Sequence, residues 1–275
     1  MSTITEDELR AFVHMQLRKA RQGSERIPFE ILEKSATVNR QANGDSRIDV
    51  KASASVADDP RYDFLTHGYG VAAFAVVLAV DLRNSTNRAA KHGPEATYLT
   101  MHTYLPTMAY LVNHCGGKVI GLRGDGLFAG FQITDALNQD ETFDSTKATS
   151  AATQSVECGF GMVQAVERVL NPILKDEKIP DDLRVGVGIT SGNLVITRIG
   201  FDSASEITAY GSCVNDACKL SSHGQNEVYI SSDVRKYYPS SPNGKVSFRL
   251  MGNRGFLLEH YPIEVVVSKA RRKAK

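Results

Sequence analysis

The chain has 275 residues, of which 42% are hydrophobic and 23% charged, enough to bury the core of one large globular domain. The formal net charge of +1 provides no overall field that would attract nucleic acid or an anionic membrane, so we expect no nucleic-acid partner. The longest apolar run, residues 71–80, is too short for a bilayer span, and we expect no direct membrane insertion. The four cysteines form no CxxC pair, which favours free thiols and a cytoplasmic protein.

The N-terminal part is predicted to begin with a helix over residues 5–20. Thr5 can cap this helix, acidic residues follow in the first turn, and basic residues gather near its end. Residues 22–70 show little periodicity, apart from a short strand expected at 48–52. We therefore treat residues 1–70 as an N-terminal extension, residues 71–268 as the main domain and residues 269–275 as a solvated basic tail.

The hydrophobic pattern becomes clear from residue 71. A buried strand over 71–81 is followed by a helix with apolar residues at spacings of three and four, which Gly116-Gly117 ends. Strands are then predicted over 118–123 and 127–131, joined through Gly124-Asp125-Gly126, a hairpin signal.

A polar loop over 132–150 precedes a second helix, whose apolar positions run from Val156 to Leu174. Alternation over 183–190 predicts a strand that Gly192 turns into another at 194–199, and a third helix and several short strands complete the domain. The order from residue 71 to 200 is β-α-β-β-α-β. This order predicts an α+β fold with a ferredoxin-like core, an antiparallel sheet with helices on one face.

Two carboxylates are placed by this order at the same edge of the sheet. Asp81 closes the first strand, and Asp125 occupies the turn of the hairpin predicted beside it. Two hard oxygen ligands on rigid elements can hold Mg²⁺ or Mn²⁺, and two such ions suit in-line attack at phosphorus. Each residue alone is also compatible with a plainer role, Asp81 as a cap and Asp125 as a turn residue.

The segment after Asp81 leads into a helix and adds to the interpretation. Free amides at a helix start, together with hydroxyl groups, form a cradle for a triphosphate, although a simple serine or threonine cap fits the same pattern. The residues of this candidate cradle are Arg83, Asn84, Ser85 and Thr86.

Four segments together resemble the catalytic domain of class III adenylate and guanylate cyclases. They are residues 80–86 (VDLRNST), 116–126 (GGKVIGLRGDG), 184–192 (RVGVGITSG) and 210–220 (YGSCVNDACKL). They fall in the family's order over about residues 70 to 265. The resemblance implies a nucleoside triphosphate substrate, two divalent cations (Mn²⁺ or Mg²⁺) and a head-to-tail homodimer with its active sites at the interface.

The resemblance also implies roles for individual residues. Asp81, the backbone of Leu82, and Asp125 would hold the metals in one subunit. Asn215 of the other subunit would orient the ribose or its 3′-oxygen. Lys219 stands where the family has an arginine that steadies the pentavalent phosphorus, so a bidentate fork becomes a point charge. Arg254 would take the place of a phosphate-binding lysine.

The positions at which the family reads the base depart from the known patterns. Adenylate cyclases carry Lys, then Asp or Thr, where this chain has Gly121 and Thr208; guanylate cyclases typically carry Glu and Cys. Thr208 can donate or accept a hydrogen bond. Arg123, on the same strand face as Gly121, could reach a base carbonyl or could be paired to an acid elsewhere.

These departures, in a free-standing cyclase domain with an irregular extension, resemble the pyrimidine cyclases of bacterial Pycsar antiphage systems. That resemblance implies conversion of UTP to cyclic UMP, which would activate a separate cyclic-nucleotide-responsive effector. Three alternatives stay open: a cytidylate cyclase, an adenylate cyclase with an atypical base pocket, and a nucleotide-binding module without turnover. No residue separates O4 of uracil from N4 of cytosine.

Overall fold

The computed structural model describes residues 4–25, 55–135, 144–201, 204–239, 246–261 and the backbone of 266–267. The strand expected at 48–52 and the basic tail lie outside these ranges, as do residues 136–143 of the polar loop predicted over 132–150. That loop is shorter than predicted, because strand and helix extend over residues up to 135 and from 145 on. In the described parts, no helix has the length and apolar character needed to cross a bilayer.

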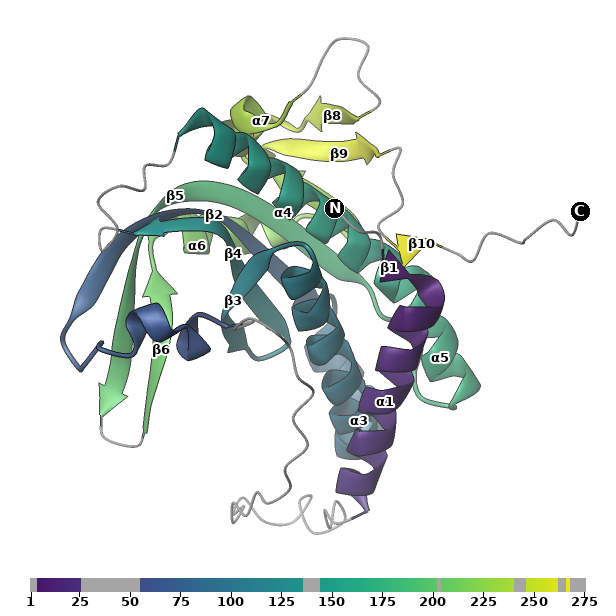
Figure 1. Cartoon of the computed structure of the whole chain (residues 1–275). Helices are drawn as coiled ribbons and strands as arrows, with labels where there is room; N and C mark the ends of the chain where they lie inside the picture. Colours follow the sequence, from purple (N-terminus) through teal and green to yellow (C-terminus); the bar gives the residue numbers. More distant parts are fainter. Residues whose placement is uncertain are drawn as a thin grey trace, which may run out of the picture.

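The predicted β-α-β-β-α-β order is confirmed (Figure 1). Its elements are β2 (Gly70–Leu82), α3 (Ser85–His114), β3 (Gly117–Arg123), β4 (Gly126–Asp135), α4 (Ser145–Ala165) and β5 (Val185–Phe201). The strands lie in the order β3-β4-β2-β5 and pair antiparallel throughout. This is the ferredoxin-like core that the sequence predicts, with β2 at its centre.

The sheet continues beyond this core in a way that the sequence did not indicate. On the far side of β5 lie β7 (Glu227–Ile230), β9 (Phe256–His260) and β8 (Ser247–Leu250), while β6 (Ala204–Tyr210) pairs with the outer half of β5. Because β7 runs parallel to β5, the sheet is mixed rather than wholly antiparallel.

Both faces of β2 are buried, each in a different apolar cluster. Val76, Leu78 and Val80 face α3 and α4, whereas Ala75, Val77 and Ala79 lie in a cluster that includes residues of α6 (Ser212–Ser221). Alternate side chains of a strand point to opposite faces, so this pattern needs a cover on each side. The two helices of the predicted core, α3 and α4, lie on one face as expected, and α6, which follows that core, covers the other.

The predicted turn at Gly192 is also wrong, because β5 continues through it as one strand. Gly192 pairs with Ala75 of β2, and a Cβ atom placed on it would lie 3.1 Å from Cβ of Cys213. The glycine thus permits close approach of α6 to the sheet. A glycine needed for close packing and a glycine needed for a turn look alike in sequence.

The second predicted helix is divided into three consecutive segments: α4, a single turn of π-helix at Val166–Leu170, and α5 (Asn171–Asp176). After β7, a short helix α7 (Ser232–Tyr237) precedes β8, and a 3₁₀ turn η4 (Gly252–Arg254) joins β8 to β9. The first residues of the chain form β1 (Ile4–Thr5), which pairs in parallel with β10 (Val266–Val267).

The N-terminal segment packs against the main domain at two places. Helix α1 (Glu6–Ser24) begins with a capping box between Thr5 and Glu8. It lies along α3 (Figure 1). The rings of Phe12 and Tyr110 stack between the two helices, 4.5 Å apart. Further on, two 3₁₀ turns, η1 (Val56–Asp58) and η2 (Pro60–Tyr62), lie against the α6 side of the sheet.

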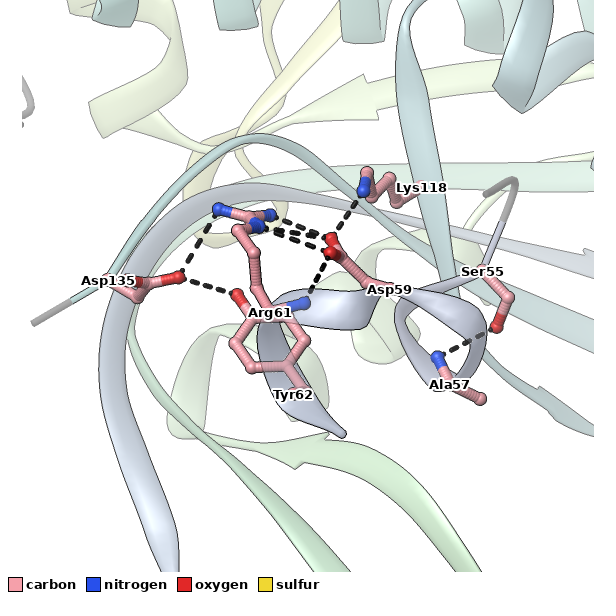
Figure 2. A network of polar contacts seen from close by, with 7 residues as sticks. All are labelled: Ser55, Ala57, Asp59, Arg61, Tyr62, Lys118 and Asp135. Atoms are coloured by element: carbon pink, nitrogen blue, oxygen red, sulfur yellow. Dashed lines mark hydrogen bonds and ion pairs between the residues drawn. The ribbon is translucent and has the colours of Figure 1, made fainter. Parts of the chain in front are cut away.

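A network of charged groups fastens these turns to the sheet (Figure 2). The carboxylate of Asp59 accepts hydrogen bonds from Arg61 and Lys118, and the carboxylate of Asp135 accepts them from Arg61 and Tyr62. Burial alone would raise the pKa of Asp59, but the bonds from Arg61 and Lys118 outweigh it and hold that pKa at about 2. We call residues 55–62, with this network, the strap.

Candidate active site

Asp81 and Asp125 lie together at one end of the central strands. Asp81 is the penultimate residue of β2 and pairs across the sheet with Gly126, the neighbour of Asp125. The amide of Leu82 donates to the carbonyl oxygen of Asp125 at 3.3 Å. A Cβ atom on Gly126 would lie 2.8 Å from the carbonyl oxygen of Val80, so only glycine lets the turn come this close.

The two carboxylates repel each other. Burial, and then the charge of Asp125, raise the pKa of Asp81, against the opposing effect of Arg83. The guanidinium of Arg83 bonds to the Asp81 carboxylate, whose side chain is still 42% exposed. The structure therefore holds an acid pair with an excess of negative charge at an open edge.

This pair fits the divalent cations that the resemblance implies. Carboxylate oxygens and a backbone carbonyl are the hard donors that Mg²⁺ and Mn²⁺ prefer, and a cation would relieve the repulsion that raises the pKa of Asp81. Within the described ranges, no group of three or more His, Cys, Asp or Glu side chains could hold a metal.

The loop after Asp81 leads directly into α3. Asn84 has a left-handed backbone (φ 60°), and no side chain caps the helix start. The amides of Leu82 and Arg83 are already bonded to the carbonyl oxygens of Asp125 and Arg184. The predicted triphosphate cradle therefore offers fewer backbone amides than expected, because the available amides begin with the first turn of α3.

A cavity of about 330 Å³ lies between this helix start and the acid pair, lined by Ser85, Thr86, Gly124 and Asp125. Arg88, which the sequence analysis passed over, also lines it and is buried. Its guanidinium pairs with Asp182 and donates to the carbonyl oxygen of Pro180 at 2.5 Å. A lone arginine in a polar helix turn gives no sign in sequence that it will be buried.

The two base-reading positions face each other. A Cβ atom on Gly121 would lie 3.6 Å from the hydroxyl of Thr208, which is buried on β6. Arg123 lies over the rings of Phe128 and Tyr210, with its guanidinium carbon 5.6 and 6.0 Å from their centroids. The strap lies close by, since Val56 belongs to the same apolar cluster as Ile120 and Ile207.

The remaining candidates, Asn215, Lys219 and Arg254, lie on α6 and η4, outside the cavity that Asp125 lines. Asn215 and Lys219 are exposed on one face of α6, and Lys219 pairs with Asp216 at 3.1 Å. Lys219 and Asn253 line a cavity of about 640 Å³, and Arg254 is exposed beside it in η4. Asp125 and Lys219 thus line two different cavities of one chain, which is compatible with a site shared between two copies.

Comparison with known proteins agrees with this geometry. The sequence profile of the adenylate and guanylate cyclase catalytic domain matches residues 73–253. A protein named uridylate cyclase, from Rhodovulum sp. (strain MB263), is 23% identical over 193 residues, which cover 68% of this chain and 73% of that protein.

Two solved structures share the fold. The adenylyl cyclase CyaB from P. aeruginosa superposes with a TM-score of 0.57 at 20% identity, covering 70% of this chain and 97% of that one. The guanylyl cyclase Cya2 does so with a TM-score of 0.53 at 23% identity, covering 70% and 91%. With more than half of its length matched by the family profile, the chain belongs to the adenylate and guanylate cyclase catalytic domains, the class III nucleotide cyclases.

Proposed function

We propose that this cyclase domain converts UTP to 3′,5′-cyclic UMP and pyrophosphate. The observation that carries the proposal is the acid pair at the sheet edge, with a helix start and its cavity on one side of it. Phosphoryl chemistry needs this combination, because negative charge must be gathered and held in line with a nucleophile.

The choice of base is supported by the pair Gly121 and Thr208. The lysine of an adenine pocket is replaced by Gly121, although Thr208 is one of the two residues that adenylate cyclases carry at its position, and the facing residues offer one hydroxyl and backbone groups. Arg123 is a donor two residues from Gly121 and is held over aromatic rings. Donors suit the carbonyl oxygens of uracil, and a relative of this chain carries the name uridylate cyclase.

In the proposed reaction, the 3′-oxygen of the ribose attacks the α-phosphorus, its proton is lost, and the bond to the β-phosphate oxygen breaks to release pyrophosphate. Asp81, Asp125 and the carbonyl of Leu82 would hold two divalent cations, Mn²⁺ or Mg²⁺. When bound, these lower the pKa of the 3′-hydroxyl and offset charge on the triphosphate. The first turn of α3, with Ser85 and Thr86, binds phosphate oxygens.

The second copy of the chain completes the site in this proposal. Asn215 orients the ribose through its amide, and Lys219 and Arg254 place positive charge where the phosphates develop negative charge. Among the described residues, Lys219 pairs with the exposed Asp216, at the surface of α6. Such a pair is weak, so Lys219 can turn to a substrate at little cost.

The cyclic nucleotide would act as a messenger to a separate effector in antiphage defence, within the cytoplasm. This part of the proposal follows from the resemblance to the pyrimidine cyclases. A culture that carries the gene and its neighbours should resist phage, and should lose resistance when Asp81 and Asp125 are both replaced by alanine. Equal resistance in the two cultures would contradict a role for the cyclic nucleotide.

The direct test is mass spectrometry of the products from an equal mixture of ATP, GTP, CTP and UTP with Mn²⁺. We expect cyclic UMP as the main product, with matching pyrophosphate. Cyclic CMP or cyclic AMP as the main product would replace uridine by the corresponding alternative. Absence of any cyclic product, with nucleotide binding retained, would indicate a binding module.

A further inference from the structure

Two buried hydroxyl groups on α3 have no hydrogen-bond partner among the described residues. Thr100 is 2% exposed and Tyr104 is fully buried, and neither Oγ1 of Thr100 nor Oη of Tyr104 is bonded. A hydroxyl group in a dry interior without a partner is costly, and such groups are rare in folded proteins. Two of them, one helical turn apart, therefore need an explanation.

Other threonines of the same helix show that Thr100 is the exception. The hydroxyls of Thr97, Thr103 and Thr107 each donate to the carbonyl oxygen four residues earlier, at 2.7–2.8 Å. This is the ordinary way in which a helical threonine is satisfied. Thr100 makes no such bond and instead lines the cavity that Asp125 also lines.

Tyr104 lies one turn further along the same face of α3. Burial, and then the charges of Asp81 and Asp125, raise the pKa of Tyr104, with Arg83 opposing them. The hydroxyl group thus keeps its proton at neutral pH, lies within the field of the acid pair and can donate a hydrogen bond.

We propose that Thr100 and Tyr104 are positioning residues whose hydroxyl groups, when a cation is bound, donate hydrogen bonds to the carboxylates of the acid pair, directly or through one water. The inference rests on the proposed metal site. A carboxylate that binds a cation through one oxygen needs a donor on the other to keep its orientation. In this structure Arg83 forms an ion pair with Asp81. The positive charge of Arg83 repels an incoming cation, whereas a neutral hydroxyl group does not.

The test compares hydroxyl deletions at two kinds of buried position. Tyr104→Phe and Thr100→Val remove the unpaired hydroxyls, and Thr100→Ser keeps one. Tyr62→Phe and Thr103→Val are matched controls, because they remove buried hydroxyls that are already bonded, at the strap and within α3. For each variant, Mn²⁺ binding is titrated by electron paramagnetic resonance, alone and with 3′-deoxy-UTP, which lacks the nucleophile, and Tm is recorded.

We expect Tyr104→Phe and Thr100→Val to weaken Mn²⁺ binding by about 10- to 100-fold, the effect usual for groups that orient metal ligands. Measured without Mn²⁺, their Tm should stay near that of the wild type, since neither hydroxyl is bonded to any of the described residues. Thr100→Ser should keep Mn²⁺ binding. The two controls should lower Tm and leave Mn²⁺ affinity unchanged, which is the opposite pattern.

Mn²⁺ affinity within twofold of wild type in both Tyr104→Phe and Thr100→Val would overturn the inference, as would a loss of affinity that only follows a loss of Tm. Asp125→Asn serves as the reference. If Asp125→Asn loses Mn²⁺ and the hydroxyl variants do not, only the inference fails. If Asp125→Asn binds Mn²⁺ as the wild type does, the proposed metal site itself is wrong.

Discussion

The acid pair and the strap each contain two aspartate carboxylates, but folding lowers the pKa of Asp59 in the strap and raises the pKa of Asp81 in the acid pair. At the strap, the carboxylates of Asp59 and Asp135 are buried and fully served by donors, which holds the pKa of Asp59 at about 2 (Figure 2). At the sheet edge, Arg83 pairs with Asp81, but burial and repulsion by Asp125 still raise the pKa of Asp81. A satisfied network stabilises the fold, whereas an unsatisfied one is kept for a ligand.

The largest expected effect is loss of turnover without loss of stability at the acid pair. Asp125→Asn removes a ligand charge, and we expect kcat to fall by at least about 10³-fold, the scale of a lost electrostatic centre. The free energy of unfolding should hold or rise, because Asp125 repels Asp81. Cyclic-nucleotide formation and thermal unfolding measure the two effects, and undiminished kcat would remove Asp125 from the reaction.

At the strap, by contrast, we expect a loss of stability without a loss of metal binding. Asp59→Asn leaves Arg61 and Lys118 without their shared acceptor, at a cost of about 2 kcal/mol in unfolding free energy. Metal binding by the folded protein should not change, since the acid pair is untouched. Urea denaturation and Mn²⁺ titration test this; a variant as stable as wild type would mean that the network contributes little.

The two regions also predict how stability depends on pH. The pKa of Asp59 falls from 3.8 to about 2 on folding, so its contribution is fully present above about pH 4 and is lost as the pH falls through 2. Between pH 5 and pH 2, wild type should lose about 2 kcal/mol more unfolding free energy than Asp59→Asn. Parallel pH curves for the two proteins would show that other carboxylates govern acid unfolding.

The smallest effect is expected from Tyr62→Phe, the strap counterpart of Tyr104→Phe. Tyr62 donates to the Asp135 carboxylate at 2.8 Å, and a buried bond to a charged acceptor contributes about 1.5–3 kcal/mol. Because Arg61 also serves Asp135, the loss should fall at the lower end of that range. A Tm equal to that of wild type would contradict the comparison.

Sequence patterns predicted the features that depend on local chemistry. Gly124-Asp125-Gly126 indicated the hairpin turn, and Thr5 with Glu8 indicated the first helix, because each signal is confined to neighbouring residues. The sequence also placed Asp81 and Asp125 at one edge, since strand order alone brings them together.

Features that depend on distant partners were not predictable. The parallel pairing of β7 and the packing of η1 and η2 follow no periodic pattern, so residues 55–62 looked irregular. The apolar pattern of α3 likewise did not indicate that the hydroxyl groups of Thr100 and Tyr104 would be buried and unbonded. Its buried face also includes threonines that bond to their own backbone, which hydrophobic periodicity does not count.

The proposed active site joins the acid pair of one chain to α6 of a second copy. The most direct test of this arrangement combines two inactive variants in one dimer. Asp125→Ala and Asn215→Ala chains, carrying different tags, are co-expressed, and the mixed dimer is purified through both tags. Each variant alone should be inactive. The mixed dimer contains one intact site of two, so it should recover about half of the wild-type turnover. A mixed dimer as inactive as its parents would contradict a centre built from the acid pair of one chain and α6 of another.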